Sequence, residues 1–146
     1  MIVTFFGHRD TPPHIEIALR NLLIDLIENK DARCFYVGTH GNFDSMAKKV
    51  LKELCTRYPH IQYAVVLAYR PPLYTLNQEE YEDTLFPESI AQTPRRFAIS
   101  KRNEWMIQKA DIIVTYVAHS MGGAAFYKTM AQKKGKTIIE LFVRDK

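Results

Sequence analysis

The stretch Asp111-Ile-Ile-Val-Thr-Tyr-Val-Ala-His-Ser-Met-Gly-Gly-Ala-Ala-Phe-Tyr-Lys128 decides the fold that this sequence predicts. Residues 112–117 are rich in Ile, Val and Tyr, which is typical of a strand buried on both faces. Gly122 and Gly123 follow in a small polar loop, after which the pattern becomes helical. The unpaired N–H groups of a helix that begins there favour an anion, and glycine lets a ligand approach the backbone. A Gly-Gly pair also occurs in ordinary turns, so its meaning depends on the rest of the chain.

Apolar segments alternate with helical patterns on both sides of this stretch. We expect strands at 2–6, 34–37, 61–69, 112–117 and 136–142, and helices at about 12–29, 42–58, 95–109 and 122–134. Thr11 is the expected cap of the first helix, with Pro12 in its first turn. This alternation predicts one α/β domain over residues 1–146, a three-layer αβα sandwich with a five-stranded parallel sheet in the order 3-2-1-4-5.

Residues 73–94 show no sustained period and contain an acidic patch from Glu79 to Asp83. A loop of this length within a compact domain is usually functional or mobile. We therefore weigh two interpretations equally, a lid over a site and a solvated surface excursion.

Composition narrows the class of protein. The 146 residues match the size of a single domain, and a 47% hydrophobic and 25% charged composition is that of an ordinary globular protein. No apolar run is long enough to span a membrane and no signal peptide precedes the first strand, so we expect a cytoplasmic protein with Cys34 and Cys55 reduced. The net charge of +4 suits an anionic small molecule as well as nucleic acid. No basic stripe with interleaved aromatic residues is present, so nucleic-acid binding is not predicted.

In the predicted sheet the chain reverses direction between the first and fourth strands, and ligands of open sheets bind outside the carboxyl ends of strands at such a point. Polar and glycine residues follow three of these strand ends, and the helix at 95–109 adds an Arg-Asn pair. The candidate ligand-binding residues are Gly7, His8, Arg9, Gly38, His40, Gly41, Phe43, Asp44, Tyr69, Arg102, Asn103, His119, Ser120, Gly122, Gly123 and Ala124. Backbone N–H groups for phosphate, Arg for charge and Asn or Asp for ribose hydroxyls suit a nucleotide-like ligand.

Several of these residues have alternative interpretations. Phe43, Tyr69 and Tyr116 can stack on a base or pack within the fold. Asp44 can bind a ribose, act as a general base or cap the second helix. The three histidines at strand ends could form a metal site, but no Glu at helical spacing and no matching Cys accompany them, so we predict neither a metal nor another cofactor. The sequence has no nucleophile elbow, Walker loop or dinucleotide-binding glycine motif.

Four segments in this order carry a resemblance to a known superfamily: Phe6-Gly-His-Arg-Asp10, Tyr36-Val-Gly-Thr-His-Gly-Asn-Phe-Asp44, Ser100-Lys-Arg-Asn-Glu-Trp-Met106 and Tyr116-Val-Ala-His-Ser-Met-Gly-Gly-Ala-Ala125. They resemble the SLOG superfamily, named after the Smf and Lonely-guy proteins, and are most similar to its small standalone bacterial and phage members. The resemblance implies a Rossmann-like fold with a nucleotide-derived ligand. Some members hydrolyse nucleoside monophosphates, others sense relatives of cyclic ADP-ribose, and others bind single-stranded DNA.

The chain departs from the enzymes of that superfamily at one motif, Pro-Gly-Gly-x-Gly-Thr-x-x-Glu. Here the glycine pair is kept, Met121 replaces the proline, and Thr129 stands where the catalytic Glu is expected. Loss of that carboxylate favours a sensor or sequestering protein for an ADP-ribose-like or nucleoside phosphate ligand. The alternative is a nucleotide N-glycosidase that uses another carboxylate, Asp44 or Asp10. A third hypothesis is an oligomeric scaffold, such as a homodimer, with a vestigial crevice.

Overall fold

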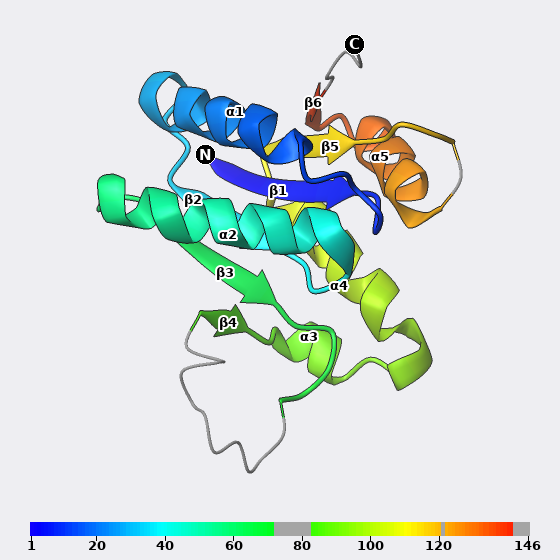
Figure 1. Cartoon of the computed structure of the whole chain (residues 1–146). Helices are drawn as coiled ribbons and strands as arrows, with labels where there is room; N and C mark the ends of the chain where they lie inside the picture. Colours follow the sequence, from blue (N-terminus) through cyan, green and yellow to red (C-terminus); the bar gives the residue numbers. More distant parts are fainter. Residues whose placement is uncertain (72–82, 121, 142–146) are drawn as a thin grey trace.

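The computed structural model describes residues 1–71, 83–120 and 122–141, and within them one parallel sheet carries helices on both faces (Figure 1). The strands are β1 (Ile2–Gly7), β2 (Cys34–Val37), β3 (Gln62–Val66), β4 (Thr84–Leu85), β5 (Ile112–Tyr116) and β6 (Thr137–Glu140). The helices are α1 (Ile15–Asn29), α2 (Gly41–Arg57), α3 (Glu88–Ala91), α4 (Ala98–Lys109) and α5 (Gly123–Lys133), with the 3₁₀ turn η2 (Arg95–Phe97) before α4.

The strand order is β4-β3-β2-β1-β5-β6, and every neighbouring pair is parallel. The predicted α/β class and strand order are therefore confirmed, with one short edge strand more than the five expected. β4 lies in the segment predicted to be irregular, where it pairs through Thr84 and Leu85 with β3, and α3 follows it. Two-residue strands and four-residue helices are too short to show a period in sequence. Residues 72–82 lie outside the described residues, and they include most of the remaining segment for which a lid and a surface excursion were weighed equally.

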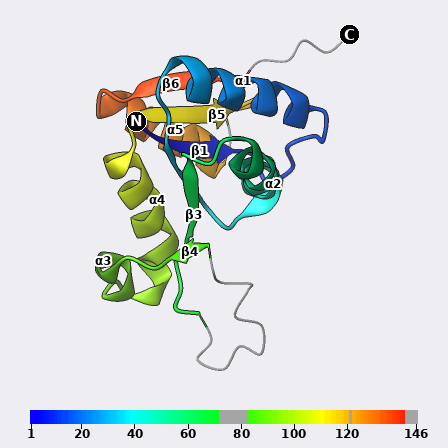
Figure 2. The ribbon, with the colours of Figure 1, turned by 90° about the vertical axis from the view of Figure 1, so that its left-hand side faces the viewer.

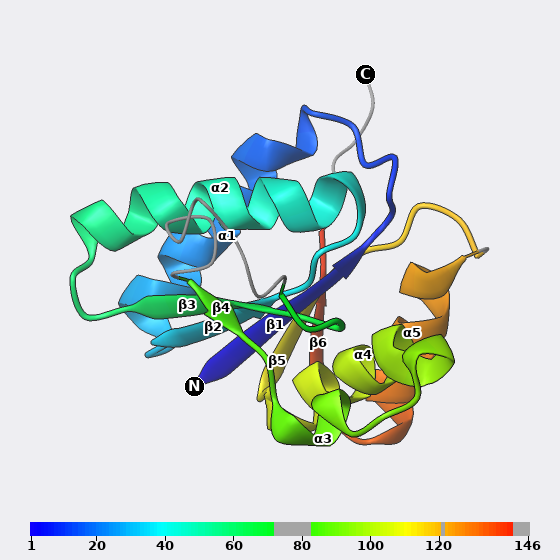
Figure 3. The same cartoon turned by 90° about the horizontal axis from the view of Figure 1, so that it is seen from below.

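Helices cover the two faces of the sheet in separate pairs. α1 and α2 pack on one face, and α4 and α5 pack on the other together with the short α3, as Figures 2 and 3 show. Side chains along β1 alternate accordingly: Phe5 belongs to the core under α1 and α2, whereas Phe6 belongs to the core under α4 and α5. The central strands are buried on both faces, which explains why their sequences are continuous apolar runs.

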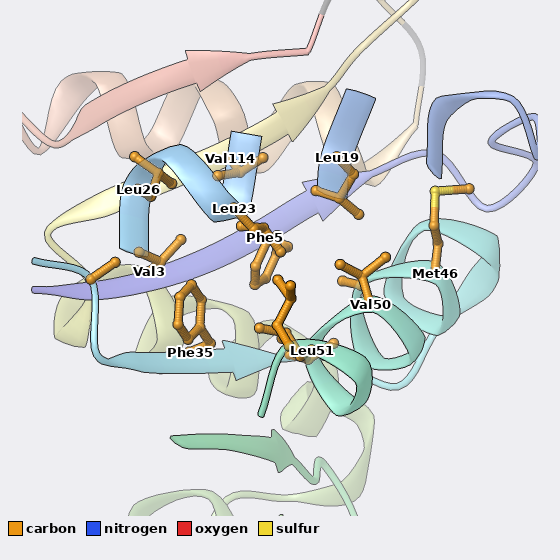
Figure 4. Close-up of a cluster of buried hydrophobic side chains, with 14 of the residues drawn as sticks. Val3, Phe5, Leu19, Leu23, Leu26, Phe35, Met46, Val50, Leu51 and Val114 are labelled. Carbon is orange, nitrogen blue, oxygen red and sulfur yellow. The ribbon is translucent and has the colours of Figure 1, made fainter. Parts of the chain in front are cut away.

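The larger core lies between the sheet and α1 with α2 (Figure 4). Phe5 and Phe35 stack on neighbouring strands with their ring centroids 6.4 Å apart. Leu19, Leu23 and Leu26 recur at three- and four-residue spacing on α1 and are almost completely buried. In the smaller core, the ring centroids of Phe6 and Tyr127 lie 5.4 Å apart, which fixes α5 against β1.

Several predicted boundaries shift. α1 begins at Ile15, because the Thr11 hydroxyl does not cap it but donates to the His8 carbonyl at 2.6 Å, closing the turn after β1. The helix expected from about residue 95 begins at Ala98, and Phe97 lies in η2, where it is 51% exposed. Cys34 and Cys55 are free and half-buried. Among the described helices, none is long and apolar enough to cross a membrane.

Two residues of α1 allow a matched test of this packing. Leu23 is fully buried, whereas Ile17 is 65% exposed on the same helix. We expect Leu23→Ala to lower the free energy of unfolding by about 2–5 kcal/mol, because it leaves a cavity in the core. Ile17→Ala should change it by no more than about 0.5 kcal/mol. Urea denaturation followed by circular dichroism measures both values, and equal losses would contradict the assigned orientation of α1.

Candidate functional site

A cavity of about 450 Å³ opens at the carboxyl end of β1. It lies between the N-terminal end of α2 and the helices α4 and α5. This position agrees with the general rule for open parallel sheets, and the volume falls in the range of small-molecule sites. Its lining includes most of the residues that the sequence predicts for a ligand: Gly7, His8, Arg9, His40, Asp44, Arg102, Asn103, His119, Gly122, Gly123 and Ala124.

The remaining predicted residues do not line the cavity: Gly38, Gly41, Phe43, Tyr69 and Ser120. Conversely, the lining contains side chains that were not among the predicted ligand contacts: Phe5, Phe6, Asp10, Ile99, Met106 and Tyr127. Of these residues, only Asp10 was named from the sequence, as an alternative catalytic carboxylate next to the Gly-His-Arg segment. The apolar residues follow ordinary core periodicity, and nothing in that pattern shows that one edge of a side chain faces a cavity.

Arg102 forms the base of the cavity wall on α4, and it is only 1% exposed. Its Nη1 donates to Thr39 Oγ1 at 2.9 Å and to the Val66 carbonyl at 3.1 Å. Its Nε donates to Asn103 Oδ1 at 2.8 Å, and its Nη2 donates to His40 Nδ1 at 3.2 Å. Every one of these acceptors is an uncharged group. The side chain therefore brings a buried positive charge to the cavity while it joins α4 to the ends of β2 and β3.

His40 is held in one tautomer by this arrangement. A guanidinium N–H can only donate, so His40 Nδ1 accepts and the ring carries its proton on Nε2. Burial, and then the positive charges of Arg102 and Arg9, hold the pKa of His40 below its ordinary value. The imidazole is thus neutral at physiological pH, and its Nε2–H group is available as a donor.

Asp44 is a cap of α2 and a cavity residue at once. Its Oδ2 accepts the backbone N–H of His40, the N-cap residue of α2, at 2.9 Å. Burial raises the pKa of the Asp44 carboxyl to about 6, although this hydrogen bond and the charge of Arg102 both oppose the shift. Gly38 leaves room for the arrangement, because a Cβ there would lie 2.7 Å from Asp44 Oδ2 and 3.5 Å from Arg102 Cζ.

The N-terminus of α5 faces the cavity without a side-chain cap. Gly122 is the N-cap residue and has φ +94°, a conformation that residues with a side chain rarely adopt. A Cβ on Gly122 would meet no atom within 4 Å, and one on Gly123 would touch only Tyr127 Cε2 at 4.0 Å. The backbone at the start of α5 is therefore not crowded at these two glycines, and the N-terminus of a helix favours an anion.

The polypeptide between β5 and α5 is fastened by side chains of both neighbouring strands. His8, at the end of β1, accepts the backbone N–H of Ala118 on Nε2 at 2.9 Å. Glu140, on β6, accepts the backbone N–H of Val117 at 3.0 Å and also pairs with Lys128 of α5 at 3.0 Å. His119 stacks on His8, with ring centroids 3.8 Å apart and planes 8° apart.

The predicted base-stacking aromatics serve other contacts. Phe43 is fully buried in the core and packs on the backbone of Gly7, where an added Cβ would lie only 2.2 Å from its ring. Tyr69 lies beneath the guanidinium of Arg95, with Cζ 4.3 Å from the ring centroid. Tyr116 packs edge-on against Phe43. The apolar side chains that line the cavity include Ile99, Met106 and Tyr127.

The comparison with family models agrees with this geometry. The model described as the YspA SLOG family matches residues 3–142. The chain belongs to the SLOG family. The search of curated proteins gave no match. The matched range contains every strand of the sheet apart from the first residue of β1, and every residue that lines the cavity.

The histidines at the strand ends have other partners in the structure. Within the part of the chain that the structure describes, no group of three or more His, Cys, Asp and Glu side chains could hold an ion. Nε2 of His8 already accepts a backbone hydrogen bond, and Nδ1 of His40 is occupied by Arg102. The rings of His8 and His40 are therefore engaged in hydrogen bonds, and the ring of His119 stacks on His8.

The raised pKa of Asp44 leads to a test by pH. A carboxyl whose pKa is higher in the folded than in the unfolded state stabilises the protein below the unfolded value, and this contribution is lost as the pH rises through about 6. We expect Asp44→Asn, which keeps an oxygen acceptor for the His40 N–H, to be more stable than the wild type at pH 7.5. At pH 4 the two should be nearly equal. Urea denaturation at both values measures the difference, and a difference that does not depend on pH would contradict the buried, protonated carboxyl.

Proposed function

We propose that this SLOG protein binds a nucleotide-derived small molecule in the cavity and holds it intact, as a sensor or sequestering protein. Membership of the SLOG family is consistent with a nucleotide-related role. The observation that carries the proposal is the combination of two cationic features in one cavity. These are the uncapped N-terminus of α5 and the buried guanidinium of Arg102, whose acceptors are all uncharged.

Each feature suits a different part of such a ligand. The first N–H groups of α5 favour a phosphate, and the glycines at 122 and 123 let it come close to the backbone. Arg102 and the exposed Arg9 supply charge for a second anionic group or a carbonyl oxygen. Asn103 is oriented through its Oδ1, so its amide nitrogen is the end of the side chain that can donate to a sugar hydroxyl. Ile99, Met106 and Tyr127 provide an apolar surface for a base.

Binding is favoured over cleavage because this chain lacks the catalytic Glu that the resembled enzymes carry in this motif. Thr129 occupies that position, is exposed, and donates to the Ala125 carbonyl at 3.1 Å. The preceding Lys128 pairs with Glu140. Neither residue lines the cavity. The helix therefore retains the part that suits a phosphate and lacks a carboxylate directed at the ligand.

Substitution of Gly123 tests the phosphate end. An Asp at the first residue of a helix favours folding, but here its carboxylate would face the anion. We expect Gly123→Asp to weaken binding of AMP or ADP-ribose by at least about tenfold, because two negative charges would share a partly desolvated space. Gly123→Asn, of the same shape without the charge, is the matched control and should retain most of the affinity.

Isothermal titration over a panel of nucleoside monophosphates and ADP-ribose measures these affinities. Mass spectrometry of the recovered compounds shows whether they remain intact. If no compound of the panel binds the wild type, or if the Asp and Asn variants bind equally, the proposal is wrong.

One observation favours a second function, hydrolysis of an N-glycosidic bond. Asp44 has a pKa of about 6 and lines the cavity together with Asp10, so it could give or take a proton near neutral pH. If this function is correct, free base and ribose phosphate accumulate from a nucleoside monophosphate. Asp44→Asn should then reduce the rate by at least about 100-fold while binding persists. Chromatography of the products decides the matter, and intact substrate after long incubation with wild-type protein rejects hydrolysis for the compounds used.

A further inference from the structure

We propose that His8, as a neutral hydrogen-bond acceptor, positions the segment 117–120 that leads to the anion site, and that protonation of His8 releases this segment. His8 thereby acts as a positioning residue that makes ligand binding depend on pH. The inference rests on the proposed function where the ligand is concerned. Its first test needs no ligand.

The segment is held by side chains in place of strand partners. β5 ends at Tyr116, and the next three backbone N–H groups point to side chains of the flanking strands. Val117 donates to both carboxylate oxygens of Glu140, at 3.2 and 3.0 Å. Ala118 and His119 both donate to His8 Nε2, at 2.9 and 3.4 Å. One ring atom of His8 therefore fixes two of the three amides that set the direction of the chain toward Gly122.

The hydrogen bonds from Ala118 and His119 determine which ring nitrogen of His8 carries the proton. A backbone N–H cannot accept a hydrogen bond, so Nε2 must present its lone pair and the proton of the neutral ring is on Nδ1. Protonation of Nε2 would place an N–H group against two others, and both hydrogen bonds would be lost in one step. Glu140 has no such requirement, because its carboxylate continues to accept the N–H of Val117.

The groups around His8 determine the pH at which its ring becomes protonated. Burial, and then the stacked His119, hold the pKa of His8 below its ordinary value of 6.5, while Asp10 and Glu140 act in the opposite direction. Lys128 of α5 pairs with Glu140, and the cavity wall also contains Arg9, His40, Asp44 and Arg102. A histidine whose pKa is lowered by folding stays neutral at any pH above its ordinary pKa. The segment is therefore held at neutral pH and released as the pH falls below 6.5 through the lowered value.

Four proteins test the inference without ligand: the wild type, His8→Gln, His8→Ala and the control His60→Gln. Gln offers an oxygen acceptor that does not titrate, Ala offers none, and His60 is an exposed histidine outside the cavity lining. Long-range ¹H–¹⁵N spectra identify the tautomer of His8 in the wild type. Amide hydrogen exchange, corrected for the intrinsic rate at each pH, gives the protection of residues 118 and 119.

We expect the Nδ1–H tautomer at pH 8, and protection at 118 and 119 that falls by at least about tenfold between pH 8 and 5 in the wild type and in His60→Gln. Protection at Val117 should change less. His8→Gln should keep its protection at pH 5, and His8→Ala should lack it throughout. An Nε2–H tautomer at pH 8, or the same loss in His8→Gln as in the wild type, would overturn the inference. Both readouts stand even if His8→Ala does not fold.

Binding of AMP and ADP-ribose, measured by titration calorimetry, provides the second test. Other groups of the cavity titrate in the wild type and in His8→Gln alike, so the ratio of their dissociation constants isolates His8. We expect this ratio to shift in favour of His8→Gln between pH 8 and 5.5, by less than about tenfold, because the pKa of His8 lies below 6.5. A constant ratio, with nucleotide bound by both, overturns the link to binding and leaves the proposed function in place. The expected exchange result without any nucleotide binding refutes the proposed function and leaves the positioning role in place.

Discussion

The crevice of this SLOG protein depends on the burial of one guanidinium group. Arg102 reaches from α4 to the ends of β2 and β3 and donates to uncharged acceptors on each. Removing a charge from water costs several kcal/mol unless hydrogen bonds and opposite charge compensate for it. The hydrogen bonds fix the position of the group, but their acceptors do not neutralise its charge. Asp44, whose pKa burial raises only to about 6, is largely ionised at neutral pH, and its negative charge acts on Arg102.

The arrangement of the sheet followed from the sequence because it needs only the order of apolar runs and the handedness of crossovers. Parallel strands end at one edge, so residues such as His8, His40 and His119 could be brought together before any coordinate was known. The edge strand β4 could not be found in this way. A strand of two residues takes its stability from pairing with β3, and such pairing has no local signature.

The roles of individual site residues were harder to predict from the sequence than the arrangement of the sheet. His8 and His119 looked alike in sequence, yet one is a buried acceptor and the other is exposed and stacked upon it. Phe43 follows a glycine-rich segment and suggested a base-stacking ring, whereas it is fully buried. Glu140 gave no signal at all, because a Glu at the end of an edge strand normally faces solvent. Its partners, Val117 and Lys128, are distant in sequence and become neighbours only through the parallel pairing of β5 with β6.

The close packing of Phe43 on Gly7 sets a dimension of the molecule. At this point α2 rests on bare backbone of β1, and the absence of one Cβ decides how near the helix comes to the sheet. Asp44 is the next residue of that helix, so its carboxyl advances or retreats with the same spacing. The lack of a side chain at Gly7 thus helps to set the width of the crevice, although Gly7 lines only one side of it. A side chain at this position would hold α2 farther from β1 and would widen that end of the crevice.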